Sequence, residues 1–308
     1  MKRFLKTILL YAVIVAAITV SVNAVYMQKR SNEAKKFENV PYGIQIANFG
    51  SSHGRDGFNY SDTEYSVYFN FALSSQLPSY DLRILKHYID HIENGGFIFL
   101  PISYFSFFGY SETDQDDFLS KNKRYYSFLP KELIKEYDPI TKFFECYFPA
   151  IATDGVDLFT TLFYHTSEDN RDAEFVQTNA SKHALSRYLS HVKNHLDIDG
   201  NRLYNQEEIS AIYEIIQLCR ERNIEPILVI TPYLSEYPLT VRENDPDFFQ
   251  DFYGVISEIQ ANTGVLYYDY SADERFSSRY DLFINTDHLN REGARQFTNI
   301  LIEETLGK

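Results

Sequence analysis

Short apolar runs alternate with amphipathic segments over residues 43–308. The runs at 97–103 and 224–232 are almost continuously apolar, as expected for strands that are covered on both faces. Strands separated by helices form parallel sheets with helical layers on both sides. We therefore predict a three-layer α/β/α domain with a five-stranded parallel sheet. Its strands are expected at 43–50, 66–73, 97–103, 224–232 and 265–271, and its helices at 79–92, 207–223, 245–264 and 291–306.

Residues 104–200 interrupt this alternation and are rich in Phe and Tyr. We predict that they form a helical insertion within the α/β domain. Its aromatic rings would stack on sugars if the insertion covers an active site, although such residues more often form hydrophobic core or a membrane-proximal surface. We assign the Phe residues to core, and the role of the Tyr residues stays open.

The N-terminal region contains 22 uncharged residues between Lys6 and Lys29. A helix of about 20 apolar residues crosses the hydrocarbon core of a bilayer. We predict a retained single-pass anchor in residues 1–27 and a polar tether at 28–42. A cleaved signal peptide, with its small-residue site at Val22-Asn23-Ala24, is the first alternative, and a buried soluble helix is the second. The first two interpretations place the α/β domain outside the cytoplasm.

The charge of the chain excludes one class of partner. There are 43 Asp and Glu residues against 29 Lys and Arg, giving a net charge of −14. A surface this negative repels phosphate backbones, and the sequence shows no local basic patch, so we predict no nucleic-acid binding. Two cysteines, Cys146 and Cys219, are too few for a disulfide-rich scaffold.

Two polar clusters follow predicted strands, at the edge of a parallel sheet where ligands usually bind. The first is Gly50-Ser51-Ser52-His53-Gly54, in which a serine at a tight turn can be an exposed nucleophile and nearby backbone amides can stabilise an oxyanion. The second runs from Asn285 to Asn290 and includes His288, a candidate general base. Ordinary turn chemistry with helix capping, and an exposed loop histidine, are the structural alternatives.

These two clusters resemble the motifs of the SGNH/GDSL hydrolase superfamily, a flavodoxin-like fold. A glycine-serine loop follows the first strand, and Asp-His-Leu-Asn-x-x-Gly-Ala precedes the last helix. The resemblance is closest to the membrane-anchored extracytoplasmic branch, which includes the teichoic-acid D-alanyl transfer protein and alginate O-acetyltransferase-like proteins. It implies that Ser52 is the nucleophile and His288 the base.

The resemblance assigns the positions of Asn70, Ser103 and the acid. The other site residues follow from their place: three flank Ser52, and Tyr233 follows the strand predicted at 224–232. Pocket or oxyanion-hole positions are expected at Gly50, Ser51, His53, Asn70, Ser103 and Tyr233. The family aspartate lies three residues before the histidine, and that position is Asn285 here. Asp287 is an alternative acid, although the side chains of adjacent residues usually point apart.

The resemblance and the anchor together predict a serine esterase or O-acyltransferase that acts on acyl esters of a cell-envelope polysaccharide or similar carbohydrate. The alternative is a catalytically inactive binding or assembly protein of the cell envelope, because Asn285 replaces the acid and no Gly-x-Asn-Asp block is present.

The chemistry needs no metal or organic cofactor. The pairs His87/His91 and His191/His195 have metal-ligand spacing without an evident third ligand, so we interpret them as solvated helix faces. The expected partners are the membrane and the carbohydrate or acyl-ester substrate.

Overall fold

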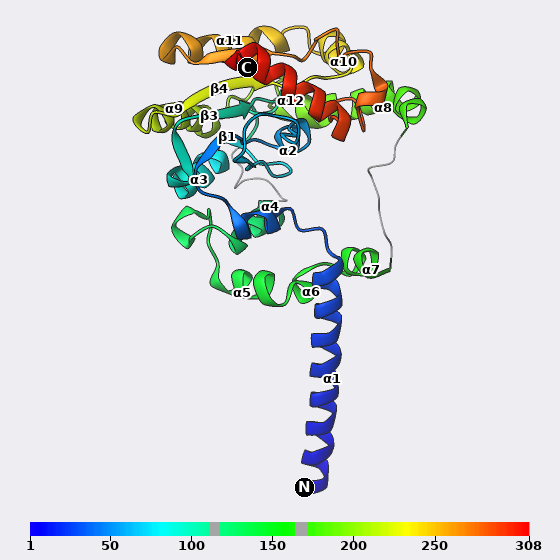
Figure 1. Cartoon of the computed structure of the whole chain (residues 1–308). Helices are drawn as coiled ribbons and strands as arrows, with labels where there is room; N and C mark the ends of the chain where they lie inside the picture. The colour runs from blue at the N-terminus through cyan, green and yellow to red at the C-terminus, as the bar shows by residue number, and fades with distance from the viewer. Residues whose placement is uncertain (111–117, 164–171, 308) are drawn as a thin grey trace. The chain divides into compact units, whose positions relative to one another are not determined.

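The computed structural model describes residues 1–110, 118–163 and 172–307 (Figure 1). The chain divides into two compact units. The first unit combines Met1–Glu38 with Asp117–Ser167, and the second combines Asn39–Asp116 with Glu168–Lys308. The segment 104–200, predicted as one insertion, therefore contributes to both units.

The second unit contains a five-stranded sheet in the order β2-β1-β3-β4-β5, with every neighbouring pair parallel. The predicted fold class is confirmed. The order reverses between β1 and β3, which is where parallel sheets of this kind bind ligands. The strands are β1 (Ile44–Asn48), β2 (Tyr68–Asn70), β3 (Ile92–Pro101), β4 (Glu225–Ile230) and β5 (Leu266–Asp269).

Helices form a layer on each side of this sheet. On one side α12 packs against α2, and on the other α9 packs against both α3 and α11. Apolar residues of α12 join those of the strands in one buried cluster that includes Ile46, Phe99, Ile227 and Phe297. The helices of this unit are α2 (Ser52–Gly57), α3 (Pro78–Tyr88), η2 (Ile89–His91), α8 (Ala173–His191), η7 (Lys193–His195), α9 (Gln206–Glu221), α10 (Glu236–Asn244), α11 (Phe248–Thr263), η8 (Tyr280–Leu282) and α12 (Arg291–Leu306).

Local sequence explains where several elements begin and end. Asn290 caps α12 by accepting the backbone N–H groups of Glu292 and Gly293 at 3.0 and 2.9 Å. The predicted helix at 79–92 ends at Tyr88 instead, and β3 already begins at Ile92. Gly95 and Gly96, which follow the predicted helix in the sequence, lie in β3, where the N–H of Gly95 donates to the carbonyl of Asn223 at 2.7 Å.

The first unit is built around α1 (Lys2–Lys29), which is long and apolar enough to cross a membrane. This confirms the predicted apolar helix by length and composition, and most of its surface is exposed in the unit. Short helices follow: η1 (Glu33–Asn39), α4 (Phe118–Asn122), η4 (Lys123–Ser127), η5 (Lys131–Leu133), α5 (Pro139–Tyr147), α6 (Pro149–Ala152) and α7 (Gly155–Phe163).

Candidate catalytic site

The loop between β1 and α2 forms one wall of the site. Gly50 adopts a φ of 100°, and a Cβ there would lie 3.3 Å from Pro101, so the tight turn requires glycine. Its N–H donates to Oδ1 of Asp81 at 2.9 Å. Burial raises the pKa of Asp81 to about 7, opposed by the hydrogen bonds from Gly50 and Gln76. The turn is therefore held by a buried carboxyl group from α3.

Ser52 is the first residue of α2 and is only partly buried. Ser51 is the N-cap of this short helix, and its hydroxyl oxygen accepts the N–H of His53 at 3.3 Å. Gly54 lies so close to the end of β1 that a Cβ would meet the carbonyl oxygen of Phe49 at 2.1 Å. Close packing of α2 on β1 thus fixes the position of Ser52.

Ser52 and His288 are brought together from loops 236 residues apart, with Oγ of Ser52 2.7 Å from Nε2 of His288. The other ring nitrogen, Nδ1, lies 3.0 Å from Oδ1 of Asn285 and 3.2 Å from Oδ1 of Asp287. Both of these oxygens are acceptors, so we assign the proton to Nδ1. Nε2 is then free to accept the Ser52 hydroxyl proton, as a general base does.

Asp287 is fully buried and receives several donors. Its Oδ2 lies 3.0 Å from Nε2 of His53, and Nε of Arg187 donates to its Oδ1 at 3.0 Å. Burial acts to raise the pKa of Asp287, but its electrostatic interaction with His288 and hydrogen bonds from His288 and His53 hold it well below its usual range. Asp287 therefore provides a negative charge beside His288, and the side chains of these adjacent residues do meet.

His53 connects Asp287 to Ser103. Burial lowers the pKa of His53, against the raising effect of its hydrogen bond with Asp287. A neutral His53 donates from Nε2 to the carboxylate, which leaves Nδ1 to accept the hydroxyl proton of Ser103 at 2.6 Å. Ser103 is 1% exposed, and Oγ of Ser51 lies 3.4 Å from its Oγ. The hydrogen bond from Ser103 thus fixes the orientation of the His53 ring.

Asn70 and Tyr233 contact residues that form the site, Asn70 through hydrogen bonds and Tyr233 through packing. The side chain of Asn70 donates to the carbonyl oxygens of Gly54 and Arg55, and it accepts the N–H of Ala72 at 3.0 Å. Tyr233 is fully buried, with its ring centroid 5.4 Å from that of His53. Asn70 therefore links β2 to α2, and Tyr233 packs against His53.

Backbone donors for an oxyanion are limited in the part of the chain that the structure describes. The Ser52 N–H lies at the first position of α2, where a helix leaves N–H groups without an intrahelical acceptor. At the end of β2, the N–H of Ala72 is bound to Asn70, and the N–H of Leu73 donates to the carbonyl of Gly50 at 3.2 Å. Of these three amides, only that of Ser52 has no acceptor among the described residues.

A stripe of polar residues on α8 was not predicted as part of the site. Arg187 binds Asp287, and Nδ1 of His183 lies 2.8 Å from Oγ1 of Thr286. His191 lies with its ring centroid 6.1 Å from that of His53. His183, Arg187 and His191 are spaced four residues apart, and this helical periodicity is the sequence signal that could have identified them.

His53, Asp287 and His288 also form the donor set of a possible metal site. One ligand atom from each lies within 4.8 Å of the others, and two imidazoles with a carboxylate suit a divalent transition metal. The same atoms are engaged with one another through the hydrogen bonds described above. Of the histidine pairs considered from sequence, His91 contacts the carbonyl of Pro41 and His191 the hydroxyl of Tyr237.

No family model matches the chain, and no curated protein shows significant sequence similarity to it. The function is therefore inferred from the geometry of the site.

Proposed function

We propose that this protein is a serine esterase or O-acyltransferase with Ser52 as nucleophile and His288 as general base. The observation that carries the proposal is the distance of 2.7 Å between Oγ of Ser52 and Nε2 of His288, with Ser52 partly exposed and His288 held from its other nitrogen. A nucleophile, a base and a group that orients the base are the three parts of acyl-transfer sites.

The reaction follows from this geometry. Oγ of Ser52 attacks the acyl carbonyl as Nε2 of His288 takes its proton, and the Ser52 N–H stabilises the oxyanion. The leaving alcohol departs with the proton from His288, which leaves an acyl-serine. An acceptor hydroxyl group then attacks the acyl-serine as His288 takes its proton. The bond from Oγ of Ser52 to the acyl group breaks, and His288 returns the proton to Oγ. Water as acceptor gives an esterase, and a sugar hydroxyl gives an acyltransferase.

Asp287 and Asn285 have different roles in this proposal. The oxygen of Asn285 holds the tautomer of His288, and the carboxylate of Asp287 stabilises the imidazolium that forms during the attack. The departure from the family pattern at residue 285 is then compensated by the neighbouring carboxylate. The proposed site is thus a triad in which the acid and the base are adjacent in sequence.

The substrate class is proposed from the resemblance to the SGNH/GDSL superfamily and from α1. An apolar helix able to span a membrane fits a single-pass membrane protein with an extracytoplasmic catalytic domain. We propose acyl esters of a cell-envelope polysaccharide or similar carbohydrate as substrate.

A catalytically inactive binding or assembly protein is the second candidate. It is favoured by the hydrogen bonds that occupy the N–H groups of Ala72 and Leu73, because these leave a smaller set of oxyanion donors than an efficient hydrolase uses. In that case Ser52 and His288 would bind an acylated ligand without cleaving it.

Hydrolysis of p-nitrophenyl acetate by the full-length protein in detergent micelles tests the proposal. We expect Ser52→Ala and His288→Ala each to reduce turnover by about 10²-fold or more. Ser61→Ala is the matched control, since Ser61 lies on an exposed loop, and it should keep the wild-type rate. Equal rates for wild type and Ser52→Ala would contradict the proposal.

A further inference from the structure

Helices α5 and α7 of the first unit carry apolar faces that the unit does not cover. None of the residues of either helix is buried. On α5 the exposed residues recur at i, i+3 and i+7, and α7 repeats this spacing, so each set lies on one helical face. Their exposed fractions range from 49% to 78%; the residues are Ile140, Phe143 and Tyr147 on α5, and Val156, Phe159 and Phe163 on α7. Soluble surfaces rarely carry so much clustered apolar area.

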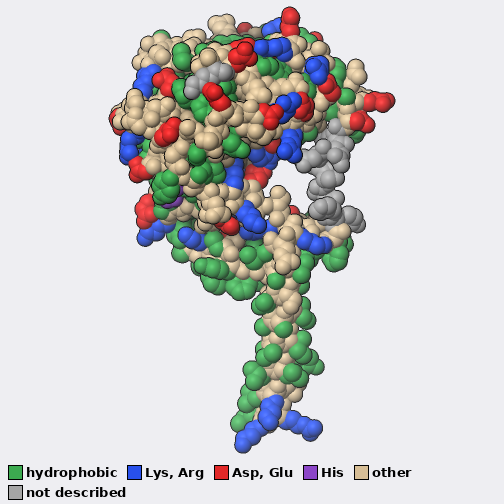
Figure 2. All heavy atoms as spheres, in the orientation of Figure 1, with side chains coloured by type: hydrophobic (Ala, Val, Ile, Leu, Met, Phe, Trp, Pro, Cys, Tyr) green, Lys and Arg blue, Asp and Glu red, His purple; other side chains and the backbone are tan. Residues whose placement is uncertain are grey.

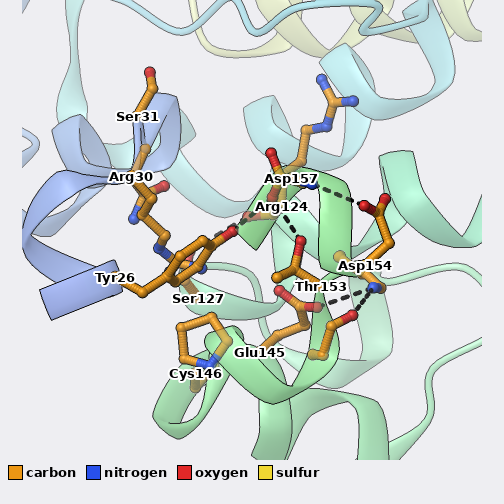
Figure 3. Close-up of a pocket in the computed structure, with 14 residues that line it drawn as sticks. Tyr26, Arg30, Ser31, Arg124, Ser127, Glu145, Cys146, Thr153, Asp154 and Asp157 are labelled. Atoms are coloured by element: carbon orange, nitrogen blue, oxygen red, sulfur yellow. Dashed lines mark hydrogen bonds and ion pairs between the residues drawn. The ribbon is translucent and has the colours of Figure 1, made fainter. Parts of the chain in front are cut away.

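These helices are fixed to the end of α1 by polar contacts. The side chain of Asn23 donates to the carbonyl of Tyr147 at 2.9 Å and accepts the N–H of Ala150 at 3.1 Å. The hydroxyl of Tyr26 donates to the carboxylate of Asp157 at 2.8 Å, as Figure 3 shows. Helices α5, α6 and α7 therefore form a collar around the last turns of α1 (Figure 1).

Polarity changes along α1 at the level of this collar. An open apolar groove of about 470 Å³ lies between α1 and α5, lined by Val20, Ala24, Met27 and Phe143 among others. A cavity of about 470 Å³ begins at Tyr26 and is lined by polar and charged groups that include Arg30 and Asp154 (Figure 3). The boundary between apolar and polar surroundings thus falls near Tyr26.

We infer that the collar lies in the headgroup region of the same bilayer that α1 crosses. The apolar faces of α5 and α7 contact lipid, and the charged cavity opens on the water side. Aromatic residues are enriched at this level of a membrane, and amphipathic helices insert only their apolar face there. Figure 2 shows hydrophobic side chains along α1 and on the surface of the first unit next to it. The inference depends on α1 spanning a bilayer and is independent of the proposed chemistry.

Tryptophan fluorescence tests the inference directly, because the chain has no Trp. Phe143→Trp and Phe159→Trp each place a single reporter on one helix of the collar. Leu239→Trp is the matched control, since Leu239 is 49% exposed on α10 in the α/β unit. The full-length variants are reconstituted into vesicles of phosphatidylethanolamine and phosphatidylglycerol, with or without bromine on the acyl chains near the headgroup.

We expect brominated lipid to quench both collar reporters about twofold or more while leaving the control unchanged. Two reporters on separate helices protect the result against misfolding of one variant. Unquenched emission from both would overturn the inference. Emission shifted to shorter wavelength without quenching would also overturn it, since a second copy of the chain would then cover the collar. Equal quenching of the control would overturn the assignment of lipid contact to the collar.

Discussion

Replacing Asp287 by Asn tests the proposed division of roles around His288. The substitution keeps the size of the side chain but removes its charge. It also places an amide NH2 group among three donors, which come from His53, Arg187 and His288 at 3.0, 3.0 and 3.2 Å. Both the stabilisation of imidazolium and the arrangement of these donors are therefore lost.

The structure sets the size of the expected effect. Loss of the acid in a Ser-His-Asp triad costs about 10⁴-fold in kcat, largely because the histidine adopts the wrong tautomer. Here Oδ1 of Asn285 still accepts from Nδ1 of His288 at 3.0 Å, so the correct tautomer persists. We therefore expect a smaller loss of about 10²- to 10³-fold, or about 3–4 kcal/mol in activation free energy. The substitution also removes the negatively charged partner of Arg187, which lowers the free energy of unfolding. Because the Arg187 side chain is 27% exposed, we expect a decrease at the low end of the range for buried pairs, about 3 kcal/mol.

The assay compares steady-state ester hydrolysis by Asp287→Asn and Asn285→Ala, each at a temperature where thermal denaturation shows it to be folded. Asn285→Ala removes the neutral acceptor and leaves the charge, so we expect a loss of about tenfold. Near-wild-type turnover of Asp287→Asn together with a large loss in Asn285→Ala would refute the reasoning. It would show that Asn285 alone orients His288.

Two further substitutions test the surroundings of the site. In the wild-type protein the folded state keeps a proton on Asp81, because the pKa of this carboxyl group is raised from 3.8 to about 7. The free energy of unfolding should therefore fall by a few kcal/mol between about pH 4 and pH 7. Asp81→Asn should lack this decline, as measured by thermal denaturation followed by near-ultraviolet circular dichroism. A parallel decline in both proteins would contradict the assignment. Asn285→Asp adds a second negative charge beside His288 and favours the imidazolium, so the acidic limb of the pH–rate profile should move to higher pH. An unmoved limb would show that residue 285 does not contact the base.

The fold was predictable because its strands are apolar and separated by helices. The runs at 224–232 and 265–271 became β4 and β5, shortened at their ends. Prediction failed at the end of the helix expected at 79–92, because the helical spacing of apolar residues continues to Ile89 and Ile92 although β3 already begins at Ile92. The division of 104–200 between two units was also missed, because aromatic composition does not show which partner a helix packs against.

The site was predictable in part for a similar reason. The loops that contain Ser52 and His288 both follow predicted strands, at the edge of a parallel sheet where ligands bind, and the resemblance to the SGNH/GDSL superfamily paired the two residues. Arg187 was missed, because its helical spacing to His183 and His191 was the only signal and no predicted strand before this helix indicated where the helix lies against the sheet. The contact between Asp287 and His288 was also unexpected, since it depends on the turn that the side chain of Asn285 forms with the backbone N–H groups of both residues.

Covalent labelling of Ser52 is the most direct measurement of the central claim. The full-length protein is treated with a fluorophosphonate, digested, and the modified residue identified by mass spectrometry. We expect the adduct on Ser52, lost in Ser52→Ala and slowed about 10²-fold or more in His288→Ala. Labelling of another serine, or none in wild-type protein that is folded, would contradict the claim that Ser52 and His288 form a working nucleophile and base.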